Sequence, residues 1–148
     1  TVGTPVLIPE DYVADLSVRL GLYRRLAEIE EEREIDAFGA ELVDRFGKLP
    51  QEVEHLLRIV AIKALCRRAN VDKIDAGPKG VVLSFRDNTF ANPDALVAFI
   101  RDQGAAARVR PDMKVVFFQD WPQAEQRLRG TTLILRRLVS IAESKKAA

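Results

Sequence analysis

One stretch, residues 41–69, constrains the fold most, because it joins two helices through a defined elbow. The first helix ends in the run ELVDRF at residues 41–46, and Gly47 can adopt the left-handed backbone conformation that closes a helix. Pro50 suits the first turn of the next helix, where its missing N–H is not needed. The sequence therefore predicts two helices held at a fixed angle by the elbow.

The two helices are expected to pack differently. In the first, Phe38, Leu42 and Phe46 share one face, which leaves Glu41 and Asp44 as neighbours on the solvent side. The second helix, residues 51–69, is apolar on two faces, and such a helix is normally enclosed by other elements. Its two stripes are Val53, Leu56, Leu57, Val60, Ala61 and Ala64 on one side and Ile59, Ile62 and Cys66 on the other. We expect it to be the central buried helix.

The length of 148 residues fits one domain, which we place at residues 5–148. Residues 1–4 lack an initiator methionine and are interpreted as a remnant of cloning or the cut edge of a longer protein. The single cysteine excludes an internal disulfide. Because no long apolar run or signal peptide is evident, we expect a cytoplasmic protein without a membrane segment.

The N-terminal half is predicted to be helical. Residues 6–8 precede Pro9 and are expected to form a short edge strand. Residues 15–29 follow as a helix whose buried stripe is expected to contain Leu16, Leu20, Tyr23, Leu26 and Ala27. The block at residues 28–36 holds six acids and one arginine, and we interpret it as a turn between helices.

After Asn70, a plausible helix cap, the pattern changes to strands. Residues 71–76 and 81–85 predict one hairpin around residues 77–80, with Val81, Leu83 and Phe85 on its buried face. Residues 108–118 predict a second hairpin. The two hairpins are expected to form a small antiparallel sheet.

Two further helices complete the prediction. Asn92 and Pro93 start a helix that runs to about residue 103. Trp121 and Pro122 open a long C-terminal helix that Gly130 is expected to weaken midway. The fold class is therefore α+β, with a helical N-terminal half, a central buried helix, two β-hairpins in one sheet and a long C-terminal helix.

No constellation of catalytic residues is evident. His55 is the only histidine and has no partners at metal-ligand spacing, and Cys66 lies on an apolar helix face that favours a packed thiol over a nucleophile. Glu41 and Asp44 could act as general acid and base, but they face solvent without sign of a pocket. We expect no enzymatic activity, no metal site and no cofactor in this domain.

The charge is divided along the chain. Residues 1–54 carry 13 acidic against 6 basic side chains, net −7, and the remaining residues carry 9 against 17, net +8. The basic part leaves open an alternative function as an auxiliary nucleic-acid-binding domain. However, Arg127, Arg129, Arg136 and Arg137 are spread around the last helix, which favours a solvated face.

Three motifs, IPEDYV at residues 8–13, RLGLYRRLA at residues 19–27 and ELVDRFGKLP at residues 41–50, occur in a specific order and spacing. Together they resemble the C-terminal domain of bacterial transcription-repair coupling factors (Mfd). The resemblance covers about residues 5–145.

This resemblance implies a non-catalytic domain at the end of a multidomain DNA translocase, whose motor domains, with their ATP and Mg, lie outside this chain. Members of that family displace RNA polymerase stalled at DNA damage and recruit UvrA for nucleotide excision repair. Their C-terminal domain packs against the N-terminal UvrB-like module and covers the UvrA-binding surface, which implies autoinhibition. By the same resemblance, Glu41 and Asp44 are the partner-binding residues, because their positions present acids to arginines of that module.

Overall fold

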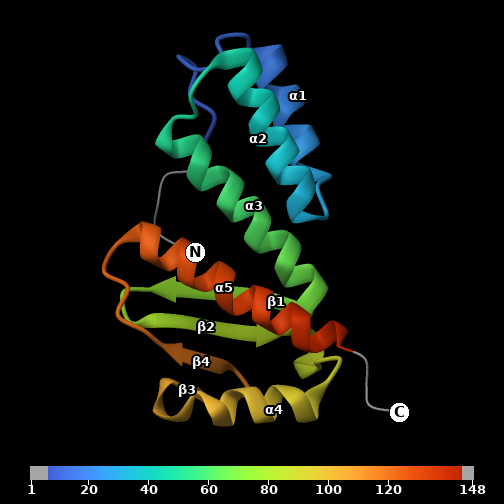
Figure 1. Cartoon of the computed structure of the whole chain (residues 1–148), viewed down its shortest axis with the longest axis vertical. Helices are drawn as coiled ribbons and strands as arrows, with labels where there is room; N and C mark the ends of the chain where they lie inside the picture. Colours follow the sequence, from blue (N-terminus) through green and yellow to red (C-terminus); the bar gives the residue numbers. More distant parts are fainter. Residues whose placement is uncertain (1–6, 145–148) are drawn as a thin grey trace. The chain divides into compact units, whose positions relative to one another are not determined.

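The structure is a computed structural model that describes residues 7–144, and it is α+β as predicted (Figure 1). Residues 1–4, the expected remnant, and Val6 of the expected edge strand lie outside the described residues. The elements are α1 (Leu16–Ala27), α2 (Glu32–Phe46), α3 (Gln51–Ala69), β1 (Val71–Gly77), β2 (Gly80–Phe85), η1 (Arg86–Asn88), α4 (Pro93–Asp102), η2 (Gly104–Ala106), β3 (Ala107–Val109), β4 (Val115–Phe118) and α5 (Ala124–Glu143).

The described residues form two compact units. Residues 7–64 make up the N-terminal unit, and residues 65–144 make up the C-terminal unit. Helix α3 has the predicted bounds and contributes residues to both. The expectation of one domain over residues 5–148 stays a prediction.

In the N-terminal unit, the predicted buried stripe of α1 is wrong in its main members. Leu16 is 60% exposed and Leu20 is 47% exposed, whereas Leu22, Leu26 and Ile29 are buried. Helix α1 carries two apolar rows, and the row that packs is the one that continues into Ile29 in the same core cluster as the apolar face of α2.

The predicted edge strand is also absent from the described part of its range, since residues 7 and 8 form no strand. Ile8 is buried, and its N–H donates a hydrogen bond to the hydroxyl of Tyr23 at 2.7 Å. A side chain of α1 therefore satisfies the backbone donor that a neighbouring strand would have satisfied.

The acidic block is only partly a turn. Residues 28–31 connect the helices, but α2 already begins at Glu32, so the predicted turn over residues 32–36 is wrong. Glu32 and Glu34 lie in the first turn of α2, where carboxylates stabilise the positive end of the helix dipole.

The elbow is confirmed. Gly47 has φ of 92°, and its N–H donates to the carbonyl of Val43 at 2.9 Å. Pro50 lies just before α3, and its carbonyl accepts hydrogen bonds from the first turn of that helix. The hydroxyl of Tyr12 lies 2.7 Å from the carbonyl oxygen of Gly47 and 3.1 Å from that of Leu42. The elbow is therefore fixed from outside as well as by its own backbone.

In the C-terminal unit, both predicted hairpins form, and they join into one antiparallel sheet of order β1-β2-β4-β3. Directly paired residues share a face of the sheet. We call the two faces the covered face and the open face. The covered face includes Val81, Leu83, Phe85, Ala107, Val115 and Phe117, and the open face includes Lys73, Asp75, Val82, Ser84, Arg108, Val116 and Phe118.

Helices α4 and α5 pack on the covered face. The ring of Phe99 in α4 lies 5.9 Å from that of Phe117, and Arg137 of α5 lies over Phe99. Figure 1 shows α5 crossing β1 and β2, with which it is in contact. The core of this unit, including Leu83 and Leu135, lies between the helices and this face.

The start of α5 and the role of Gly130 differ from the prediction. The helix begins at Ala124, because Gln123 and Gln126 form a capping box, so Trp121 lies outside it. A Cβ atom at Gly130 would overlap the ring of Trp121. The glycine therefore makes room for an aromatic side chain that packs across the helix.

Candidate functional site

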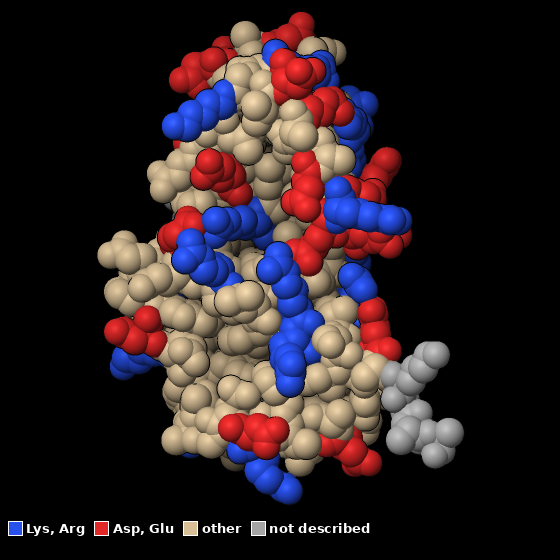
Figure 2. Space-filling model, viewed as in Figure 1, with Lys and Arg blue, Asp and Glu red and all other residues tan. Residues whose placement is uncertain are grey.

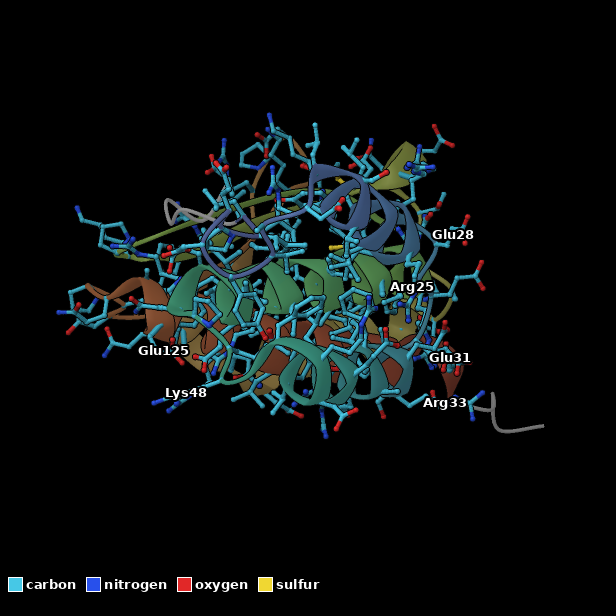
Figure 3. The ribbon with its side chains drawn as sticks, turned by 90° about the horizontal axis from the view of Figure 1, so that it is seen from above. Arg25, Glu28, Glu31, Arg33, Lys48 and Glu125 are labelled. Atoms are coloured by element: carbon cyan, nitrogen blue, oxygen red, sulfur yellow. The ribbon has the colours of Figure 1, made fainter. Side chains whose placement is uncertain are left out.

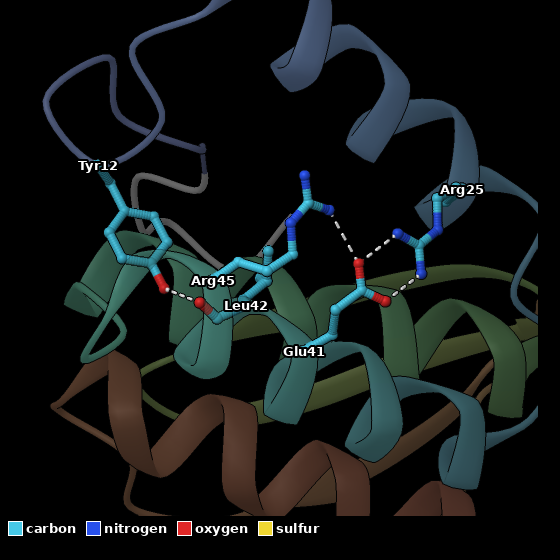
Figure 4. Close-up of polar contacts among 5 residues, drawn as sticks. All are labelled: Tyr12, Arg25, Glu41, Leu42 and Arg45. Atoms are coloured by element: carbon cyan, nitrogen blue, oxygen red, sulfur yellow. Dashed lines mark hydrogen bonds and ion pairs between the residues drawn. The ribbon is translucent and has the colours of Figure 1, made fainter.

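The two predicted partner-binding residues lie on α2 in different surroundings. The carboxylate of Glu41 accepts two hydrogen bonds from the guanidinium of Arg25 in α1, both at 2.7 Å, and one from Arg45 at 3.0 Å (Figure 4). The Glu41 side chain is 35% exposed. It connects α1 to α2, so the structure commits this acid to a contact within the N-terminal unit.

The two arginines perturb the titration of Glu41. Hydrogen bonds from Arg25 and then Arg45 lower the pKa of Glu41 from 4.5 to about 2. The same pair raises the pKa of Arg25. Each guanidinium also lies 4.9 Å from an aromatic ring centroid, Arg25 over Phe38 and Arg45 over Phe46, which holds both cations in place.

Asp44 lies one turn further along α2 and is exposed. Within residues 7–144, its side chain makes no hydrogen bond or ion pair. Its neighbour Val43 is 48% exposed, and Ala40 and Asp36 are exposed along the same side of the helix. These four residues form what we call the outer face of α2, a narrow apolar strip with an available carboxylate at each end.

A groove lies beside Glu41 between α1 and α2. It encloses about 410 Å³, and its lining includes Glu28, Glu34 and Glu41 around the apolar side chains of Ile29 and Phe38. Figure 3 places Arg25, Glu28, Glu31 and Arg33 together at the end of the unit where α1 joins α2. The groove therefore has a mainly acidic rim over an apolar floor.

The net negative charge of the N-terminal part does not produce a surface of one sign. On the face drawn in Figure 2, acidic and basic side chains lie next to one another over the N-terminal unit. This face therefore presents individual charges of both signs rather than a broad field of one sign.

The family model described as the TRCF domain matches residues 2–96. The transcription-repair-coupling factor of Rickettsia bellii (strain RML369-C) is 39% identical over 132 residues, which are 89% of this chain and 11% of that protein. That of Haemophilus influenzae (strain ATCC 51907 / DSM 11121 / KW20 / Rd) is 34% identical over 136 residues, 92% of this chain and 12% of that protein.

This chain belongs to the TRCF domain family. The resemblance drawn from the three motifs is thus confirmed. A crystal structure described as the C-terminal domain of transcription-repair coupling factor superposes with a TM-score of 0.81 at 22% identity, covering 97% of this chain and 92% of that one, which shows a shared fold. The chain spans about a tenth of the length of the curated relatives it matches.

In this TRCF domain, the other residues singled out from sequence lie in packed positions. His55 is buried in α3. Burial raises the pKa of the Cys66 thiol to about 12, so its thiolate is scarce near neutral pH. Among residues 7–144, no group of three or more His, Cys, Asp or Glu side chains is arranged to hold a metal ion. The described helices include none that is long and apolar enough to cross a membrane.

The arginines of α5 are largely engaged within the C-terminal unit of the TRCF domain. Arg127 donates hydrogen bonds to the carbonyls of Trp121 and Pro122 at 3.0 and 2.9 Å. Arg129 lies 3.9 Å from Glu125, and Arg137 covers the Phe99 ring as described above. Arg136 is exposed. These contacts give most of the α5 arginines structural roles.

Sequence reasoning missed Arg25 and Arg45 as partners of Glu41. Arg45 was detectable, because a residue four positions along a helix is a neighbour. Arg25 lies 16 positions before Glu41, and only the register between α1 and α2 brings the two together.

Proposed function

We propose that this chain is the non-catalytic, autoinhibitory interaction domain of a cytoplasmic transcription-repair coupling factor. It packs on the N-terminal UvrB-like module of the same polypeptide, masks the surface that binds UvrA and restrains the DNA translocase. RNA polymerase and DNA are then contacted through other domains of the parent protein. Membership of the TRCF domain family supports the identity of the parent protein, and the exposed Val43 and Asp44 at one end of the outer face of α2 support the mode of binding.

The observation that carries this proposal is the exposed carboxylate of Asp44 beside the exposed side chain of Val43. An interface of this kind combines apolar contact with a charge that needs a basic partner. Glu41 contributes differently, since Arg25 and Arg45 already hold its carboxylate. In this proposal Glu41 fixes α2 against α1, and Asp44 is the acid that is available to an arginine of the module.

The relatives support an intramolecular contact. They are about nine times longer than the segment they share with this chain, so most of each polypeptide lies outside it. A tethered partner is present at an effective concentration of about millimolar, which makes a contact that would be weak between separate molecules sufficient.

The test compares the affinity of UvrA for four forms of the full-length parent protein: wild type, a deletion of this chain, Asp44→Arg and Asp36→Arg. Deletion and Asp44→Arg are expected to tighten UvrA binding, because both open the masked surface. Asp36→Arg makes the same charge change on the outer face two turns away and is the matched control, with unchanged affinity expected.

Two results would contradict the proposal. The first is an unchanged UvrA affinity after deletion of this chain, because that result would exclude masking. The second is equal tightening by Asp36→Arg and Asp44→Arg, which assigns the effect to net charge. The ATPase rate of the same proteins tests the proposed restraint of the DNA translocase, since loss of that restraint should raise the rate.

A further inference from the structure

The open face of the sheet combines exposed cations with an exposed aromatic ring. Phe118 is 43% exposed, and the guanidinium of Arg108 lies 5.6 Å from the centroid of its ring. The strand pairing places Lys73 on β1 and Arg108 on β3 at opposite edges of the same face. Three inter-strand spacings separate these edges, roughly 14 Å.

The charges on this face are unequal. Lys73 and Arg108 are exposed, Lys114 is half-buried, and none of the three forms an ion pair within residues 7–144. The acid on the same face is Asp75 on β1. Asp112 forms an ion pair with Arg110, with 2.8 Å between Oδ2 and Nη2. The open face therefore has an excess of positive charge outside ion pairs, although Arg108 lies over an aromatic ring as Arg137 of α5 does.

The centre of this face is apolar, with Val82 half-buried and Val116 buried. Val82 and Val116 pair across β2 and β4 between Asp75 on one edge and Arg108 on the other. A shallow hollow of about 340 Å³ borders the ring and is lined by Pro78, Lys79, Phe118, Gln119 and Asp120. A flat group can therefore lie against Phe118, close to Arg108 and to Lys79 and Asp120 of the hollow.

We propose that the open face binds single-stranded DNA. A base stacks against Phe118, and the backbone phosphates cross the sheet between Arg108, Lys114 and Lys73. Stacking on exposed aromatics combined with a basic track is how sheets bind single strands without sequence preference. An acidic protein segment would use the cations but would gain nothing particular from the ring, so the exposed Phe118 favours a nucleic acid. This surface shares no residue with the outer face of α2.

The test measures the fluorescence anisotropy of a labelled oligo(dT) of about 12 nucleotides titrated with the full 148-residue chain. Three phosphate contacts predict that affinity falls about 20-fold between about 50 and 200 mM salt. Phe118→Leu keeps an apolar side chain without a ring and is expected to weaken binding by about 5-fold to 150-fold, whereas Phe118→Trp retains it.

Charge variants distinguish DNA binding by the open face from DNA binding by the arginines of α5. Arg108→Gln and Lys73→Gln should each weaken binding and reduce the steepness of the salt dependence by about 0.7 in log-log slope. Arg129→Gln removes an exposed α5 arginine and is the matched control, with unchanged affinity expected. Circular dichroism of every variant confirms that it is folded.

Three outcomes would overturn the proposal. No anisotropy change at about 50 mM salt excludes binding of a single strand with three phosphate contacts. Equal losses for Arg129→Gln and Arg108→Gln, or wild-type affinity for Phe118→Leu, exclude this face. Displacement of the oligonucleotide by an equal charge concentration of polyglutamate shows an acidic protein segment to be an equally good occupant.

Discussion

Replacing Glu41 with glutamine tests whether its role is internal, as the structure indicates. Glutamine keeps the size of the side chain but removes the charge that Arg25 and Arg45 share. Exposed ion pairs contribute only about 0.2–1 kcal/mol each. Two such pairs predict that the free energy of unfolding falls by about 1 kcal/mol at pH 7. The low pKa alone would suggest a larger loss, but solvent screens a carboxylate that is a third exposed.

The loss of stability expected for Glu41→Gln depends on pH. The pKa of Glu41 is lower in the folded chain, about 2, than its ordinary value of 4.5. A group of this kind stabilises the folded state above its unfolded pKa, and the contribution disappears as pH falls through the folded pKa. The stability difference between wild type and Glu41→Gln should therefore be full above about pH 5 and shrink steadily as pH falls from 4.5 toward 2.

The tyrosine side chains of the chain provide a spectroscopic signal for this measurement. Its two tyrosines, Tyr12 and Tyr23, lie in the N-terminal unit, whereas its one tryptophan lies in the C-terminal unit. Urea unfolding followed by the near-ultraviolet circular dichroism of tyrosine, at pH 7 and pH 3, reads the unit that contains Glu41. Asp44→Asn is the control, expected within about 0.5 kcal/mol of wild type. A loss for Asp44→Asn equal to that for Glu41→Gln, or a difference that does not shrink at pH 3, refutes the reasoning.

Four further outcomes are expected. Gly130→Ala should lower stability by about 1–3 kcal/mol in urea unfolding, because its methyl group overlaps the Trp121 ring. Gly21→Ala, with no described atom within 4 Å of the new Cβ, should raise it by about 0.4–1 kcal/mol. Tyr12→Phe removes the hydroxyl that fastens the elbow and should cost about 0.5–1.5 kcal/mol in the same assay. Iodoacetamide at pH 8 should alkylate Cys66 on the order of 100-fold more slowly in the folded chain than in guanidinium chloride, as mass spectrometry can follow.

The elements that sequence predicted well are those whose ends carry local signals. Gly47 and Pro50 bracket the elbow, and Asn70, with φ of 62°, closes α3 where the prediction put its cap. The Gly77–Gly80 pair likewise closes the first hairpin. Each signal acts through the backbone of one or two residues, so no knowledge of distant contacts was needed.

The features that sequence missed depend on partners far along the chain. Helix α1 has two apolar rows, and only its packing partner decides that Leu22 rather than Leu20 is buried. Glu41 was correctly placed on α2, but its pairing with Arg25 requires the register of two helices. The position of Glu41 on α2 could therefore be predicted from the sequence, whereas its ion pair with Arg25 could not.

The proposed masking is sensitive to Asp44 because, without the Asp44 pair, the closed and open states of the parent protein would have similar free energies. A contact with a dissociation constant of about 1 mM between separate molecules would be closed about half of the time at a millimolar effective concentration. Leaving a desolvated partner of Asp44 unpaired costs about 2–5 kcal/mol. If the intact pair stabilises the closed state by about 2 kcal/mol, the closed-to-open ratio becomes about 30 to 1. UvrA then binds the parent protein about 30-fold more weakly than it binds the unmasked protein. Asp44→Arg should recover most of that factor, so a variant whose UvrA affinity stays within twofold of wild type would show that Asp44 does not hold the mask closed.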